Sequence, residues 1–142
     1  MSYATLQDII NRYSNQDLVQ LTNEDPAAIT INSAVLQQAL DDASAEIDGY
    51  LGARFVLPLS YPPSVLNRLA ADIAMYRVQS LRPIHDLADA RKRYDDAIAM
   101  LTRTAAGELT LGIAADGRET AASADQAEGP ARVFNRSTLK GF

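Results

Sequence analysis

The clearest hydrophobic pattern in the chain lies between residues 32 and 52. Leu36, Leu40, Ala43, Ile47 and Tyr50 recur at steps of 4, 3, 4 and 3 residues, which places them on one face of an α-helix. Asn32 or Ser33 is suited to cap the start of this helix, and Gly52 follows its expected end near Tyr50. The pattern predicts a long amphipathic helix with one buried face.

Two further helices follow with the same kind of spacing. Pro63 suits the first turn of a helix that continues to about Ser80 and ends before Arg82-Pro83. Its apolar positions are Leu66, Leu69, Ile73 and Tyr76. Asp86 is expected to cap the next helix, which fades at residues 105–107. The apolar face of that helix comprises Leu87, Ala90, Tyr94, Ala97, Ile98 and Leu101.

The N-terminal region predicts shorter elements. Thr5 is an expected N-cap with Asp8 three residues later, close to a capping box. Ser14 or Asn15 restarts the helix for a turn or two, and the polar residues before Pro26 predict a loop. The segment 56–63 contains three prolines, so we expect an extended connector there.

These elements predict an all-α fold, a small antiparallel bundle of about four main helices with an extended, partly flexible C-terminal tail. Residues 1–112 form the expected helical domain. Residues 109–113 alternate in polarity and are compatible with a short strand.

The C-terminal part of the chain differs in composition. Residues 113–130 carry almost no large apolar side chain beyond Ile113, which predicts a flexible linker. Residues 129–142 have a net charge of +3 and regain apolar side chains, so we expect 131–142 to be a docking peptide. Its expected partner-binding residues are Arg132, Val133, Phe134, Arg136, Leu139, Lys140 and Phe142. The alternative, that this peptide folds back on its own helical body, stays open.

Composition narrows the classes of function. The 142 residues carry a net charge of −5, which disfavours nucleic acid as the principal partner because duplex binding needs clustered cations. The chain contains no cysteine and one histidine, so disulfides, thiolate metal sites and two-imidazole sites within one subunit are not expected. The chain has no apolar run of membrane-spanning length and no signal-peptide pattern, so we expect a soluble, cytoplasmic protein. We expect no cofactor.

Each of the candidate catalytic residues has a simpler interpretation than catalysis. His85 lies in an expected helix-entry turn, where an exposed or structural role is favoured. The pairs Asp41-Asp42 and Asp95-Asp96 point about 100° apart on a helix, so they do not converge on one ligand. The run of cations at 91–93 splays around its helix, which favours surface ion pairs within the subunit or between subunits. The six tyrosines are expected at core edges, with interface anchoring as the sharper alternative. An enzyme is therefore disfavoured.

Several segments together resemble the Mu-like bacteriophage and prophage neck protein family, which is similar to the head–tail connector (adaptor, head-completion) proteins of long-tailed phages. Residues 3–13 (YATLQDIINRY) resemble its N-terminal signature, and residues 45–59 (AEIDGYLGARFVLPL) its central one. The remaining matching segments are residues 62–63, 69–74, 93–97, 107–112 and 133–142.

The resemblance implies a structural virion protein without catalysis. It implies a ring of twelve copies below the portal protein in the neck of the virion, after assembly in the host cytoplasm. Such a ring extends the DNA channel, lets DNA pass without sequence-specific binding and presents a surface to the next neck or tail-completion protein, with no membrane involved. It also implies a C-terminal tail that reaches the portal or a neighbouring subunit. The alternative function is an acidic, host-directed binding module expressed from a prophage.

Overall fold

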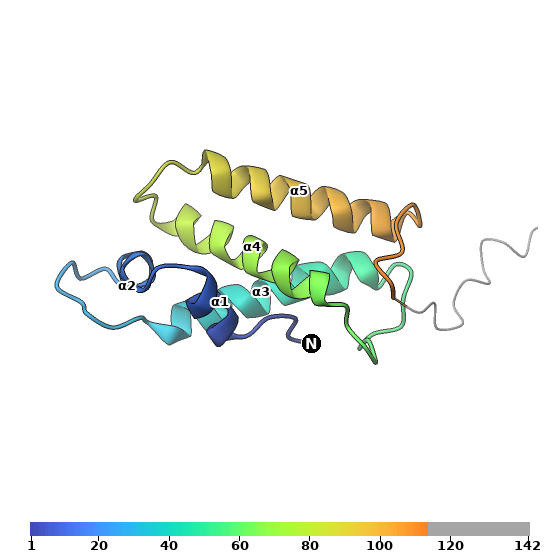
Figure 1. The fold of residues 1–142 in the computed structure, drawn as a ribbon, viewed down its shortest axis with the longest axis horizontal. Coiled ribbons are helices and arrows are strands. Elements are labelled where there is room, and N and C mark those ends of the chain that lie inside the picture. Colours follow the sequence, from blue (N-terminus) through green and yellow to red (C-terminus); the bar gives the residue numbers. More distant parts are fainter. Residues whose placement is uncertain (114–142) are drawn as a thin grey trace, which may run out of the picture.

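The computed structural model describes residues 1–113, which contain five α-helices (Figure 1). Three are long: α3 (Ser33–Leu51), α4 (Ser64–Leu81) and α5 (Ala88–Ala105). Two are short: α1 (Leu6–Arg12) and α2 (Asn15–Thr22). The predicted all-α class is confirmed, with no strand in residues 1–113. The predicted segments 114–130 and 131–142 lie outside the described residues.

The three long helices run alternately up and down, and each contacts the other two (Figure 1). The helices α3 and α5 share one direction, and α4 runs in the opposite direction. The short helices α1 and α2 pack against α3, and α2 also contacts α4. Because α4 contacts both long neighbours, it is buried on more than one face.

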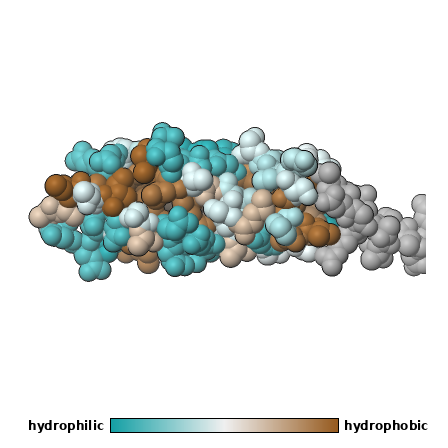
Figure 2. Space-filling view, turned by 90° about the horizontal axis from the view of Figure 1, so that it is seen from below, coloured by the Kyte–Doolittle hydropathy of each residue, from teal (hydrophilic) through white to brown (hydrophobic). Residues whose placement is uncertain are grey.

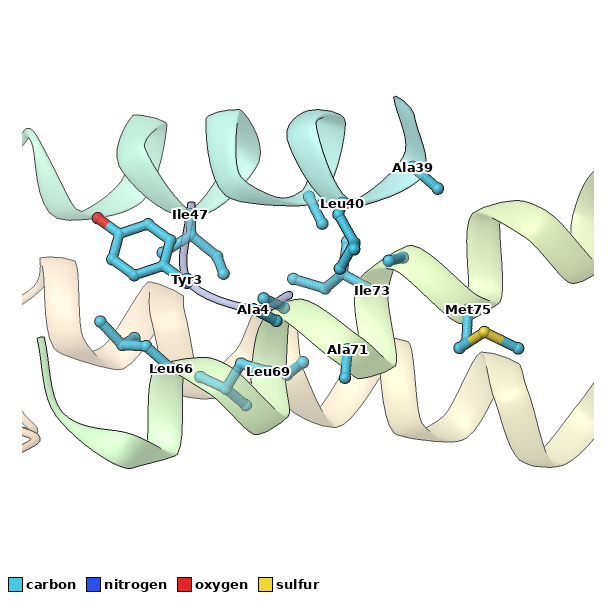
Figure 3. Packing of buried hydrophobic residues seen from close by; sticks show 14 of the residues in the cluster. Tyr3, Ala4, Ala39, Leu40, Ile47, Leu66, Leu69, Ala71, Ile73 and Met75 are labelled. Atoms are coloured by element: carbon cyan, nitrogen blue, oxygen red, sulfur yellow. The ribbon is translucent and has the colours of Figure 1, made fainter. Parts of the chain in front are cut away.

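The core lies mainly between α3 and α4 (Figure 3). Leu40, Ile47 and Ile73 are completely buried there, and the N-terminal residues Tyr3 and Ala4 pack into the same cluster. Small side chains are also buried along both helices, and small residues let helix axes approach closely. These are Ala39, Ala43, Ala70, Ala71 and Ala74. The abundant alanines of the sequence therefore serve helix packing as well as helix propensity.

The helix starts follow the sequence pattern at α1, α2 and α3. The Thr5 hydroxyl accepts a hydrogen bond from the Asp8 backbone N–H at 3.3 Å, and the Asp8 carboxylate accepts one from the Thr5 N–H at 2.7 Å. These two bonds form the capping box. Ser14 and Asn32 cap α2 and α3. The predicted caps are therefore confirmed at these three helices.

The capping box at Thr5 and Asp8 allows a prediction of how the stability of the fold depends on pH. Hydrogen bonds from Thr5, and a further one from Asn67, hold the pKa of Asp8 below its ordinary value. A lowered pKa means that the ionised carboxylate stabilises the fold above the unfolded-state pKa, and that this contribution is lost as the pH falls through the folded-state pKa. We expect Asp8→Asn to be less stable than the wild type at neutral pH. Urea denaturation over a pH series should show this difference disappearing on acidification, and a constant difference would contradict the assignment.

The predicted cap of α5 needs correction. The cap of α5 is Leu87 and not Asp86, because the helix begins at Ala88. The Asp86 carboxylate nevertheless accepts a hydrogen bond from the Ala88 N–H at 3.0 Å, so it stabilises the first turn from one residue further back.

The short strand considered for residues 109–113 is wrong. The chain turns here, with a hydrogen bond of 3.0 Å from the Ile113 N–H to the Thr110 carbonyl. Leu111 and Gly112 both have positive φ, at 50° and 72°, which is incompatible with an extended strand. The turn brings Ile113, the first residue of the predicted linker, back against the core with 9% exposure.

Gly107, which follows α5, has a φ of 81°, and a Cβ there would lie 2.0 Å from Nη1 of Arg54. We expect Gly107→Ala to lower stability by about 1–2 kcal/mol, since L-residues are disfavoured in the left-handed region. The matched control is Gly49→Ala inside α3, where a Cβ would meet nothing within 4 Å. That substitution should raise stability by about 0.5–1 kcal/mol. Thermal unfolding of both variants checks the signs, and two shifts in the same direction would contradict the expectation.

The surface carries apolar residues among the polar ones. Figure 2 shows hydrophobic residues that reach the surface between hydrophilic ones on one face of the molecule. Among the described residues, large apolar side chains are well exposed at Ile29, Val56, Tyr61, Leu81 and Ile84. None of the described helices is long and apolar enough to cross a membrane.

Candidate functional site

An apolar groove opens between three helices at one end of the bundle. It has a volume of about 700 Å³ and is formed by the first half of α3, the last turns of α4 and Tyr94 of α5. Its lining residues are Ala34, Val35, Gln38, Ala39, Asp42, Tyr76, Arg77, Ser80, Leu81 and Tyr94. Leu81 is 73% exposed, so the groove presents a large apolar side chain to solvent.

Two aromatic rings form the wall on the α4–α5 side. Tyr76 and Tyr94 stack with their ring centroids 4.6 Å apart and an interplanar angle of 26°. The Arg91 guanidinium lies 5.8 Å from the Tyr76 ring centroid, and its Nη1 donates to the Tyr76 hydroxyl at 3.3 Å. A stacked pair of this kind holds both rings in place, because aromatic packing adds to the energy of their burial.

A polar network at Glu46 holds these side chains in place. Arg77 Nη2 donates to Glu46 Oε2 at 2.6 Å, and the Tyr94 hydroxyl donates to Glu46 Oε1 at 2.8 Å. The Glu46 side chain is 19% exposed. The hydrogen bond to Glu46 raises the pKa of Arg77. Burial of the Tyr94 hydroxyl, and to a smaller extent its hydrogen bond to Glu46, raises the pKa of Tyr94. Both partners therefore stay protonated near neutral pH, and one carboxylate links α3, α4 and α5.

This arrangement suits binding better than proton transfer. Both oxygens of Glu46 already accept hydrogen bonds within the network, and most other lining residues are apolar or neutral. Concave apolar surfaces with few polar groups bind apolar ligands or segments of polypeptide. The groove is therefore the candidate interaction site of the described chain.

The candidate catalytic residues do not converge on one point, and of them only Asp42 lines the groove. His85 is exposed, with Nε2 3.7 Å from the Asp17 carboxylate. Asp41 and Asp42 each accept a hydrogen bond from a glutamine one turn earlier on the helix surface. Within residues 1–113 no group of three or more acidic or histidine side chains could hold a metal ion. His85, Asp41 and Asp42 are all exposed, as the sequence pattern predicts.

Two of the three cations at 91–93, Arg91 and Arg93, take part in surface ion pairs, as predicted. Arg91 pairs with Asp95 at 3.2 Å along α5, and Arg93 lies 3.9 Å from Asp72 of α4. Burial raises the pKa of Asp72 even though Arg68 and Arg93 lie nearby. These pairs lie within one chain. Pairs between subunits remain a prediction.

The tyrosines differ in their burial, and interface anchoring by any of them stays a prediction. Tyr3 is buried and its hydroxyl donates to Asp48, and burial raises its pKa. Tyr61 in the proline-rich connector is 90% exposed. Tyr76 and Tyr94 line the groove.

The groove as a unit was missed by sequence reasoning, because its residues come from three helices. The apolar spacing marked Tyr76 and Tyr94, but the sequence holds no signal that Glu46 joins Arg77 and Tyr94. The predicted tail residues 132–142 lie outside the described residues.

Comparison with known proteins places the chain in a family. A family model described as "Bacteriophage Mu, Gp36" matches residues 3–128. The chain is 39% identical over 142 residues to the Mu-like prophage FluMu protein gp36 of Haemophilus influenzae, covering 99% of this chain and 97% of the relative. It is also 37% identical over 147 residues to gene product J of Escherichia phage Mu, covering 100% of this chain and 99% of the relative. The chain therefore belongs to the bacteriophage Mu Gp36 family, a family of Mu-like phage proteins.

Proposed function

We propose that the protein is a structural component of the phage particle, a head–tail connector located in the neck. Twelve copies form a ring below the portal protein, extend the DNA channel and bind the next neck or tail-completion protein. The observation that carries this proposal is the family relationship over the whole length of the chain to proteins of Mu and a Mu-like prophage. The resemblance of the sequence segments to connector proteins supports the position in the neck.

The charge of the helical body supports passage of DNA. Residues 1–113 carry fourteen acidic and nine basic side chains, and all of the net charge of −5 lies in them. An acidic surface repels phosphate, so DNA can slide past it without being held. The proposal therefore includes DNA passage without sequence-specific binding.

The surface of the body supports association with other proteins. The apolar groove and the exposed Leu81 leave apolar area in contact with water, and burying such area stabilises complexes. The proposed role requires shape and contacts only, so it involves no catalysis and no cofactor.

Deleting residues 131–142 tests the proposed docking role of the tail. Burying a Phe or Leu side chain stabilises by about 1.5–3 kcal/mol, and the segment contains Val133, Phe134, Leu139 and Phe142. We expect phage that carry the deletion to accumulate separate heads and tails in electron micrographs. The helical content of the purified protein, measured by circular dichroism, should remain that of the body. Normal joining of heads to tails would refute the docking role.

Cryo-electron microscopy of intact particles tests the position in the neck. We expect a ring of this protein between portal and tail, with the helical body recognisable in the map. Absence of the protein from mature particles would overturn the connector role and would favour the host-directed binding module.

A further inference from the structure

We propose that residues 131–142 of one copy occupy the α3–α4–α5 groove of a neighbouring copy. This inference rests on the self-association included in the proposed function and identifies the contact that makes it. It names the occupant of the groove as a second chain of this protein.

The groove and the segment match in hydrophobicity. Pockets of about 300–1,000 Å³ enclose most of a drug-sized ligand, and the groove of about 700 Å³ falls within this range. It can therefore receive a few large side chains. The segment supplies Val133, Phe134, Leu139 and Phe142 within ten residues. Seating them would cover Leu81, which is 73% exposed in the single chain.

The two partners also match in charge. Residues 129–142 contain Arg132, Arg136 and Lys140 and no acidic residue. The groove lining holds one carboxylate, that of Asp42, and one guanidinium, that of Arg77, whose charge is already paired with Glu46. The body as a whole carries the net charge of −5. Opposite charge accelerates encounter and disfavours wrong partners.

The position of the groove relative to the end of the described chain implies that a contact between copies would be of the head-to-tail kind. The groove lies at the start of α3 and the end of α4, whereas the described chain ends at Ile113, beyond α5 (Figure 1). That end of α5 lies beside the end of α3, because Gly107 is close to Arg54. The end of the described chain and the acceptor groove therefore lie at opposite ends of the bundle. Contacts of this head-to-tail kind generate rings when the rotation closes.

The length of the connecting chain allows this contact. Between Ile113 and Val133 lie 19 residues, which can span at most about 66 Å when extended. The α3 helix of 19 residues is about 29 Å long. The linker is thus long enough to reach the groove of a neighbouring copy, and the dependence of the cross-link on concentration distinguishes this contact from one within the same chain.

Engineered cysteines in the full-length chain test the proposal, because the natural chain contains none. Ser80 lines the groove and is exposed. Full-length Ser80→Cys protein is mixed with full-length Ser137→Cys protein and oxidised over a concentration series. We expect a disulfide-linked heterodimer whose yield rises with concentration, identified by mass spectrometry of the linked peptides. Adding Leu81→Ser to the groove chain should lower the yield about tenfold or more, as expected for the loss of one buried leucine contact.

The matched control is Ser64→Cys, an exposed serine at the other end of α4. It should give at least about tenfold less heterodimer under the same oxidation. Equal yields at Ser64 and Ser80, or no heterodimer with either, would overturn the proposal. A Ser80→Cys/Ser137→Cys double variant that forms only an intrachain disulfide, at a yield independent of concentration, would overturn it in favour of a segment folded back on its own body. None of these results bears on whether the protein lies in the neck, which microscopy of particles decides separately.

Discussion

Replacing Ile73 by alanine should lower the free energy of unfolding by about 2–5 kcal/mol, the range found for truncating large buried aliphatic side chains. Ile73 is 0% exposed and lies on α4 facing α3, in the cluster that includes Leu40 and Ile47 (Figure 3). The substitution removes the apolar burial and leaves a cavity between two helices. Because a domain of this size has only about 5–15 kcal/mol of stability, the loss should shift the urea denaturation midpoint strongly.

A matched control substitution distinguishes the effect of burial from the effect of the residue type. Ile29 is 86% exposed in the loop between α2 and α3. We expect Ile29→Ala to change the free energy of unfolding by no more than about 0.5 kcal/mol. Both variants are compared in urea by far-ultraviolet circular dichroism. Similar losses in the two variants would contradict the core described for α3 and α4.

Replacing Glu46 by alanine should lower the free energy of unfolding by about 1–3 kcal/mol. The substitution removes the acceptor for Arg77 and for the Tyr94 hydroxyl at the same time, and unsatisfied donors that are shielded from water cost about this much. Glu46 is 19% exposed and Arg77 is 41% exposed in its side chain. Because water reaches both side chains in part, we expect a smaller loss of stability than for breaking a fully buried ion pair.

The control for this network is Glu24→Ala. Glu24 pairs with Arg82 at 3.1 Å, but the Glu24 side chain is 91% exposed, and such surface pairs contribute about 1 kcal/mol or less. A double-mutant cycle with Glu46→Ala and Tyr94→Phe should show non-additive losses, because the two side chains share one hydrogen bond. Additive losses, or an effect at Glu24 equal to that at Glu46, would contradict the role assigned to Glu46.

The periodicity of the sequence predicted the long helices well. The face that includes Leu36, Leu40 and Ile47 is buried as expected, since an amphipathic helix has one stable way to turn its apolar side inward. The capping box at Thr5 and Asp8 was predicted equally well because it depends on residues within one turn. Local interactions of this kind are readable from a single segment.

Other features depended on contacts between segments. The alternation at residues 109–113 suggested a strand, but a strand needs a partner, and Leu111 and Gly112 turn the chain instead. Asp86 matched a cap by residue type, yet α5 begins at Ala88. Ala70 and Met75 are buried outside the predicted seam of α4, because α4 contacts both α3 and α5.

The sequence by itself determined the helical class, the order and approximate extent of the long helices, and a family resemblance that comparison confirms as a Mu-like phage family. Only the tertiary structure decided that Glu46, Arg77 and Tyr94 meet, and that an apolar groove remains open beside them. The physical reason is that helix formation follows from periodicity and capping over a few residues. A groove and its polar support depend on how three helices pack, which no single stretch of sequence contains.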